Sequence, residues 1–224
     1  MGLKKDVIKD FDQIARLNDA KWDHNKHYLP YLLNHVPQNC MAALDIGCGV
    51  GEFTRLLAQK SHSVIGIDFS PKMIERAIKE SAEFPNIEYQ LSDFIEQELN
   101  PEQFNCIVSI ATIHLLPLEM FLRKAKGALK PGGVLLVLDL YETNTMSDFF
   151  TSVIAVPINM LYMLIKTGKV NLPKEDILVW NEHAKNDQYL TLHEIKATAN
   201  TIITGASVKR HLFWRYSLIW KKPF

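Results

Sequence analysis

The sequence predicts an α/β fold in which helices cover both faces of a doubly wound, mainly parallel sheet. Three observations carry this prediction. Short apolar runs alternate with helical segments between residues 40 and 140, the first run ends in alternating glycines, and residues 207–220 have the pattern of an antiparallel hairpin. Alternation of strands and helices is typical of parallel strands joined by crossover helices.

The elements follow in order from the apolar periodicity. The expected strands are residues 42–46, 63–68, 87–91, 106–111 and 134–140, and the helices between them are residues 52–59, 71–81 and 118–129. Ser70 followed by Pro71 is a helix-start signal. The segment 130–133, Lys-Pro-Gly-Gly, indicates a turn before the fifth strand.

Both ends of the chain extend this core. Helices are expected over residues 3–18 and 30–35, and Thr191 with Glu194 forms a capping box that opens a helix to about residue 203. The last two strands reverse near Trp214 and Arg215. With them the sheet has seven strands, and the chain ends on an antiparallel one.

Composition narrows the classes of function. A chain of 224 residues with 47% hydrophobic residues predicts one globular domain. Equal numbers of basic and acidic residues argue against a nucleic-acid partner. Cys40, Cys48 and Cys106 contain no C-x-x-C pair, which predicts reduced thiols and no metal site. The first 12 residues lack a secretory apolar region, so we expect a cytoplasmic protein.

The glycine loop that follows the first strand indicates a nucleotide-cofactor site. Asp45 precedes Gly47, Gly49 and Gly51, a helix follows at once, and Asp68 ends the second strand. Glycines let the backbone turn sharply and approach a ligand closely, and an acid at the end of that strand can bind both hydroxyls of a ribose. The spacing G-x-G-x-G differs from the G-x-G-x-x-G of nicotinamide dinucleotide sites.

These motifs resemble those of the class I S-adenosylmethionine (SAM) dependent methyltransferases over residues 40–140 and at the final hairpin. The resemblance implies a Rossmann-like methyltransferase fold that binds SAM and releases S-adenosylhomocysteine. It assigns cofactor contacts to the loop, to the ribose acid, to the adenine side and to the end of the fourth strand: Asp45, Gly47, Cys48, Gly49, Gly51, Asp68, Phe69, Met73, Ser92, Asp93, Phe94, Ile110 and Ala111.

Several of these residues also have a structural interpretation. Asp68 can cap a helix, Asp93 can make an Asx turn, Cys48 can be a small filler, and Phe69 and Met73 can belong to the core.

Catalytic residues are less defined, because methyl transfer from a sulfonium needs positioning more than acid–base groups. The sequence shows no catalytic dyad. His114, just after the fourth strand, is the candidate general base, and the alternative is a contact with the cofactor or loop packing. For Asp139 and Tyr141, after the fifth strand, a structural role is favoured.

The N-terminal segment 21–28 is rich in rings and can form a lid over the methionine end of SAM, with His27 and Tyr28 as contacts, or a buried connection between helices. His183 and His193 are expected at the surface. The expected organisation is a lid over 1–38, a SAM-binding core over 39–141, an insert over 142–190 and a final helix with hairpin over 191–224.

The apolar run 149–165 is interrupted by Pro157 and Asn159. Because a bilayer span needs about 20 apolar residues, we expect no transmembrane span. The favoured interpretation is a buried helix pair that forms the wall of an apolar pocket, and the alternative is contact with a membrane surface.

The predicted function is methyl transfer from SAM to a small, partly apolar organic acceptor by a monomer or homodimer. The alternatives are a SAM-binding protein without catalysis, or a nicotinamide-dependent oxidoreductase.

Overall fold

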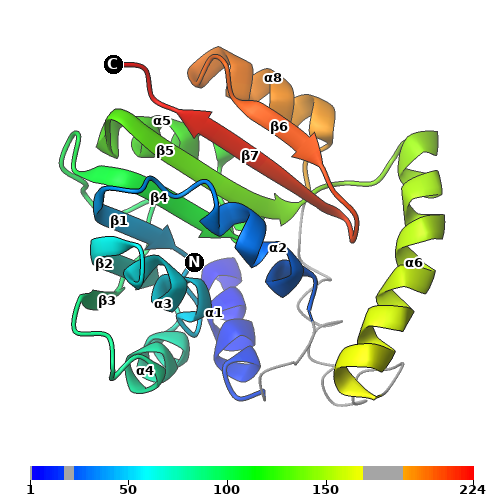
Figure 1. Ribbon diagram of the computed structural model, residues 1–224, viewed down its shortest axis with the longest axis horizontal. Helices are drawn as coiled ribbons and strands as arrows, with labels where there is room; N and C mark the ends of the chain where they lie inside the picture. Colours follow the sequence, from blue (N-terminus) through cyan, green and yellow to red (C-terminus); the bar gives the residue numbers. More distant parts are fainter. Residues whose placement is uncertain (1, 18–22, 169–188) are drawn as a thin grey trace.

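The sheet has the predicted topology. In the computed structural model, which describes residues 2–17, 23–168 and 189–224, seven strands lie in the order β3-β2-β1-β4-β5-β7-β6 (Figure 1). The strands are β1 (Cys40–Ile46), β2 (Ser61–Asp68), β3 (Ile87–Leu91), β4 (Phe104–Ile110), β5 (Leu129–Leu140), β6 (Ser207–Arg210) and β7 (Arg215–Lys221). The first five are parallel, and β7 runs antiparallel to both of its neighbours.

Helices cover both faces of the sheet, as predicted. They are α1 (Gly2–Ile14), α2 (His24–Leu33), α3 (Glu52–Ala58), α4 (Pro71–Glu80), α5 (Leu118–Ala128), α6 (Met146–Thr167) and α8 (Leu192–Ile202), with a short 3₁₀ helix, η1 (Ile113–Leu115). The core under α2 and α3 contains Phe53 and Leu57, and the core under α5 and α8 contains Phe121 and Ile195. Since the strand order reverses between β1 and β4, a cleft is expected at their carboxyl ends.

Strand β5 begins five residues before the predicted boundary. Residues 130–133 lie within the strand because the end of the chain pairs with them: Gly132 N donates to Lys222 O at 2.9 Å, and Lys222 N donates to Gly133 O at 2.8 Å. A register shift against β4 and the positive φ of Gly132, 75°, accommodate the glycines. A proline–glycine segment is typical of a turn, and only its distant partner makes it a strand.

Helix α2 begins six residues before the predicted start at Pro30. The Asp23 carboxylate caps it by accepting from Asn25 N at 2.7 Å and Lys26 N at 2.9 Å. Pro30 therefore stands inside the helix rather than in its first turn. Lys21 and Trp22, from the segment expected to form a lid, lie outside the described residues.

The prediction of a buried helix pair over residues 149–165 is wrong. α6 is one continuous helix in spite of Pro157, opened by a Thr145–Asp148 capping box and ended by Gly168 at a φ of 72°. Most of its large apolar side chains are exposed, among them Val153, Leu161 and Ile165. It is also the one helix within the described residues that is long and apolar enough, by length and composition, to cross a membrane.

Candidate functional site

The glycine loop joins β1 to α3 in a conformation that demands glycine. Gly47, Gly49 and Gly51 have φ values of 68°, 52° and 78°. A Cβ on Gly47 would collide with the side chain of Thr112, whereas a Cβ on Gly49 would meet no protein atom within 4 Å. Gly47 is therefore required by packing, and Gly49 leaves open space where a ligand can approach the backbone.

Asp68 ties this loop to the end of β2. Its carboxylate accepts from Gly49 N at 2.9 Å and from Ser70 N at 2.8 Å. Burial raises the pKa of Asp68, while the backbone N–H groups of Ser70, Gly49 and Phe69 act in the opposite direction. A carboxylate has about four acceptor positions, so two remain for ribose hydroxyls. The capping geometry and the ribose role predicted for Asp68 are thus compatible.

Asp45 lies below the loop rather than on its open side. Only 2% of its surface is exposed, and its carboxylate accepts from the Thr54 hydroxyl at 2.6 Å, which fixes α3 against β1. Burial raises the pKa of Asp45 to about 7. Cys48 is buried as well, and burial raises the pKa of its thiol well above the usual value, so it is not a nucleophile at neutral pH.

The N-terminal helix α1, which belongs to the segment expected to form a lid over residues 1–38, packs beside the end of β2. Phe11 packs edge-on against Phe69 with ring centroids 5.4 Å apart, and the Asp12 carboxylate accepts from the Ser70 hydroxyl at 2.6 Å. Met73 is buried. The amphipathic spacing of the first helix was readable, but the surface on which it packs was not.

Residues 92–94, which follow β3, lie beside the candidate cofactor site mainly through their backbone, because the side chains of Asp93 and Phe94 have structural contacts. Ser92 N donates to Asp68 O at 2.9 Å, which places the segment beside the ribose acid. The Asp93 carboxylate accepts from Ile95 N at 2.8 Å, the Asx contact of the structural interpretation. Phe94 is buried in the core against Phe121. A contact of Asp93 with adenine stays a prediction.

The end of β4 lies against the glycine loop at the point where the strand order reverses. Ala111, which follows Ile110, has a φ of 50°, a left-handed conformation that a residue with a Cβ rarely adopts. Its N–H donates to Leu138 O at 2.8 Å, and the Thr112 hydroxyl lies 3.0 Å from Ile110 O. This strained turn directs the chain into η1, which carries His114.

His114 and Asp139 form a buried pair that the sequence did not reveal. His114 Nδ1 lies 2.7 Å from Asp139 Oδ1, and His114 N donates to Asp139 Oδ2 at 2.9 Å. Their side chains are 5% and 0% exposed. Because a carboxylate only accepts hydrogen bonds, Nδ1 carries a proton, and in the neutral imidazole the lone pair is then on Nε2. Asp139 therefore holds the imidazole in one tautomer.

The side chains of His27 and Tyr28 are directed toward the C-terminal hairpin and α6. The Tyr28 hydroxyl donates to Leu212 O at 3.0 Å, and the His27 ring lies 5.4 Å from those of Tyr162 and Phe213. Their neighbour Lys26 approaches the loop, with its Nζ 3.0 Å from Glu52 Oε1 at the start of α3. Contacts of His27 and Tyr28 with the cofactor stay predictions. His183 lies outside the described residues.

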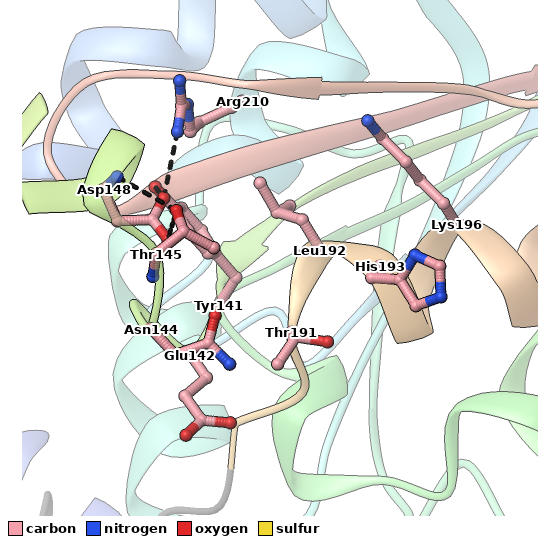
Figure 2. Close-up of a pocket in the computed structure, with 10 residues that line it drawn as sticks. All are labelled: Tyr141, Glu142, Asn144, Thr145, Asp148, Thr191, Leu192, His193, Lys196 and Arg210. Carbon is pink, nitrogen blue, oxygen red and sulfur yellow. Dashed lines mark hydrogen bonds and ion pairs between the residues drawn. The ribbon is translucent and has the colours of Figure 1, made fainter.

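A polar cavity lies beyond the carboxyl end of β5 (Figure 2). It has a volume of about 430 Å³ and brings together the first turns of α6 and α8 with β6. The buried Asp148 is one of its lining residues and pairs with Arg210 at 3.0 Å. The lining residues are Tyr141, Glu142, Asn144, Thr145, Asp148, Thr191, Leu192, His193, Lys196 and Arg210.

These residues fit an adenosyl cofactor. The open space at Gly49 and the carboxylate of Asp68, which are joined by a hydrogen bond, offer a close approach and a ribose acceptor on the same side of the loop. Contacts to SAM would come from the backbone of the loop, from Asp68 and from the segment after β3.

Comparisons with known proteins agree with this fit. The methyltransferase domain family matches residues 44–137. An uncharacterized methyltransferase of Mycobacterium tuberculosis is 28% identical over 208 residues, which cover 92% of this chain and 99% of that protein. The 2-phytyl-1,4-naphtoquinone methyltransferase of Thermosynechococcus vestitus is 30% identical over 150 residues, which cover 60% of this chain and 64% of that protein.

The fold is shared with solved structures. The N-methyltransferase NodS from Bradyrhizobium japonicum, in complex with S-adenosyl-l-homocysteine, matches with a TM-score of 0.66 and 14% identity, over 97% of this chain and 99% of that one. Residues 44–137 match the methyltransferase domain family, and motif, relatives and fold together support a class I SAM-dependent methyltransferase.

Proposed function

We propose that this methyltransferase acts on a small organic acceptor that has a polar end and an apolar body. The observation that carries the proposal is the polar cavity at the base of α6, a helix that presents an apolar surface (Figure 2). Arg210, Lys196 and Glu142, which line the cavity, can bind a polar end, and the exposed apolar side chains of α6 suit a hydrocarbon part. The relative named as a phytyl-naphthoquinone methyltransferase supports an acceptor of this kind.

The protein's main contribution is positioning. SAM supplies a methyl group on a sulfonium, and its leaving group departs neutral. The chain has to hold the acceptor in line and exclude water, and such ordering supplies about 7–11 kcal/mol. The glycine loop and the strained turn at Ala111, at the carboxyl ends of β1 and β4, are the rigid features that would hold the cofactor.

His114 is the proposed general base for an acceptor that arrives protonated. With its proton held at Nδ1 by Asp139, its Nε2 lone pair can take a proton from a hydroxyl or an amine. Asp139 is a positioning residue, because it acts through the imidazole and stabilises the imidazolium that forms. Asp139 lies in β5, and Tyr141, two residues later, follows the strand and lines the cavity, so strand alternation predicts that their side chains share one face.

The test is a methyl-transfer assay with SAM that measures S-adenosylhomocysteine formation. The acceptor panel contains naphthoquinols with and without a hydrocarbon tail, together with water-soluble catechols and amines. We expect turnover of tailed quinols, and a decrease of about 10²–10⁴-fold in kcat for His114→Gln. The matched control is His62→Gln, because His62 is exposed near the start of β2.

Three outcomes would contradict the proposal. Turnover of the water-soluble acceptors alone would exclude the apolar acceptor. An unchanged kcat in folded His114→Gln would exclude the base. Binding of S-adenosylhomocysteine without turnover of any acceptor would favour a SAM-binding protein without catalysis.

A further inference from the structure

The side of α6 that faces the protein body mixes polar residues with apolar ones, among them the buried Ala155 and Met163, and the opposite side is apolar. In a globular protein the apolar stripe of a helix faces the core and the polar stripe faces water. Here the stripe directed at the protein body holds polar contacts: Ser152 Oγ accepts from Trp214 Nε1 at 3.0 Å, and Asn159 Oδ1 lies 3.1 Å from His24 Nε2. Asp148, at the first turn, pairs with Arg210.

The opposite face is apolar and exposed. Val153, Ile154, Val156, Met160, Leu161, Leu164 and Ile165 are between 46% and 68% exposed. At about 100° per residue, these positions spread over about half of the helix circumference. No charged residue occurs between residues 149 and 165. An apolar surface of this extent marks an interaction site.

We propose that this apolar face of α6 docks on the surface of a lipid bilayer, with the helix lying in the plane of the membrane. The inference concerns a partner rather than the acceptor. It uses the same exposed apolar side chains of α6 as the proposed acceptor, and its test measures vesicle binding rather than turnover. It rests on the shape, size and polarity of the exposed face.

A second copy of the chain fits this face less well than lipid. Two helices touch along one strip, and a strip about 33 Å long and about 10 Å wide is well short of the roughly 800 Å² per partner that a stable interface buries. Protein interfaces also carry about one hydrogen bond per 100–200 Å², and the side chains that form this face offer no donors. A fluid hydrocarbon layer can cover half of a cylinder without requiring hydrogen bonds.

The body-side contacts favour a helix that lies on the membrane over one that crosses it. They run from Asp148 to Tyr162, whose ring lies 5.4 Å from that of His27, and they include the buried Ala155 and Met163. Crossing the bilayer would break all of them, whereas lying on the surface keeps them. Figure 1 shows α6 running along one side of the molecule, so its outer face can meet a flat surface.

The experiment is co-sedimentation of the whole chain with phosphatidylcholine vesicles at low and high salt. We expect the protein to sediment with the vesicles at both salt concentrations, because apolar insertion is not screened. The variant Leu161→Glu/Leu164→Glu should bind at least tenfold more weakly. The control is Met41→Glu/Ile78→Glu, since these residues are 55% exposed on β1 and α4. It should bind like the parent protein.

Binding of S-adenosylhomocysteine by each variant shows that it is folded. As a second measurement, a tryptophan introduced by Leu161→Trp should be quenched by brominated phosphatidylcholine. Parent protein that stays in the supernatant would overturn the proposal, and so would vesicle binding that high salt abolishes. A dimer in light scattering that Leu161→Glu/Leu164→Glu converts to monomer, without vesicle binding by the parent, would assign the face to a second copy instead.

Discussion

Replacement of Asp68 tests the centre of the cofactor site. In the ribose assignment, two acceptor positions of the Asp68 carboxylate bind ribose hydroxyls, and the other two hold Gly49 N and Ser70 N. Loss of hydrogen bonds to a charged acceptor costs about 1.5–3 kcal/mol. Asp68→Ala should therefore weaken SAM binding by about ten- to hundredfold.

The same substitution has a separate effect on stability. Because Asp68 is only 6% exposed, Gly49 N and Ser70 N lose their acceptor in a buried setting. At about 1–3 kcal/mol for each of the two unsatisfied groups, the free energy of unfolding should decrease by about 2–6 kcal/mol. Asp68→Asn keeps one acceptor oxygen and should decrease both quantities by about half as much.

The assay is calorimetric titration with SAM and S-adenosylhomocysteine, paired with thermal unfolding of the same samples. Glu88→Ala is the control, since Glu88 is an exposed acid on the neighbouring β3. A folded Asp68→Ala protein that binds SAM with parental affinity would refute the ribose assignment and leave Asp68 as a loop support alone.

Three further predictions concern Gly49 in the glycine loop, Asp45 at the end of β1, and His24 at the start of α2. Gly49→Ala should cost roughly 1–2 kcal/mol of folding stability because of the left-handed φ of this residue, and should cost more than that in the free energy of SAM binding. Gly127→Ala in α5, where a Cβ also meets no atom within 4 Å, is the control and should leave the SAM affinity unchanged in the same titration. Asp45→Asn should raise the free energy of unfolding at pH 8 by on the order of 2 kcal/mol. The pKa of Asp45 in the folded protein, about 7, lies above its unfolded value, so the stability that the protonated carboxyl gives the parent protein is lost as pH rises toward 7. Denaturant titrations from pH 5 to 8 would contradict this if the free energies of unfolding of parent and variant change with pH in parallel. Burial, aided by the charge of Arg215, lowers the pKa of His24, so stability should fall as pH drops below about 6.5; His24→Gln should decrease that slope by up to about 1.4 kcal/mol per pH unit, measured as melting temperature against pH.

Much of the fold could be predicted from the sequence, because the patterns that specify strands and helices lie within short segments of the chain. The alternation of apolar runs and helical periodicity predicted the parallel strands and the helices between them, and the capping box at Thr191 predicted the start of α8. The errors lie where a distant partner decides. Residues 130–133 have the composition of a turn and become a strand when residue 222 pairs with them. Pro30 resembles a first-turn proline and stands inside a helix that Asp23 opens earlier.

The candidate site also combines features that local sequence predicts with features that only tertiary contacts create. The glycine spacing and the acid that ends β2 are close in sequence, and each has a conformational or chemical requirement that only a few residue types meet. His114 and Asp139 were each noticed without their pairing, because the side chains of residues 25 positions apart meet only when β4 and β5 lie side by side. The wall that α1 adds beside Phe69 depends on packing between helices that no local pattern encodes.

By itself the sequence predicted the strands and helices of a mainly parallel α/β sheet and the glycine loop, since backbone conformation and periodicity are fixed by residues near one another. Tertiary structure alone decided the His114–Asp139 pair, the polar cavity and the exposure of α6. An apolar run has the same composition whether it is buried or exposed, and only the neighbours that the fold brings to it determine which of its faces meets the protein.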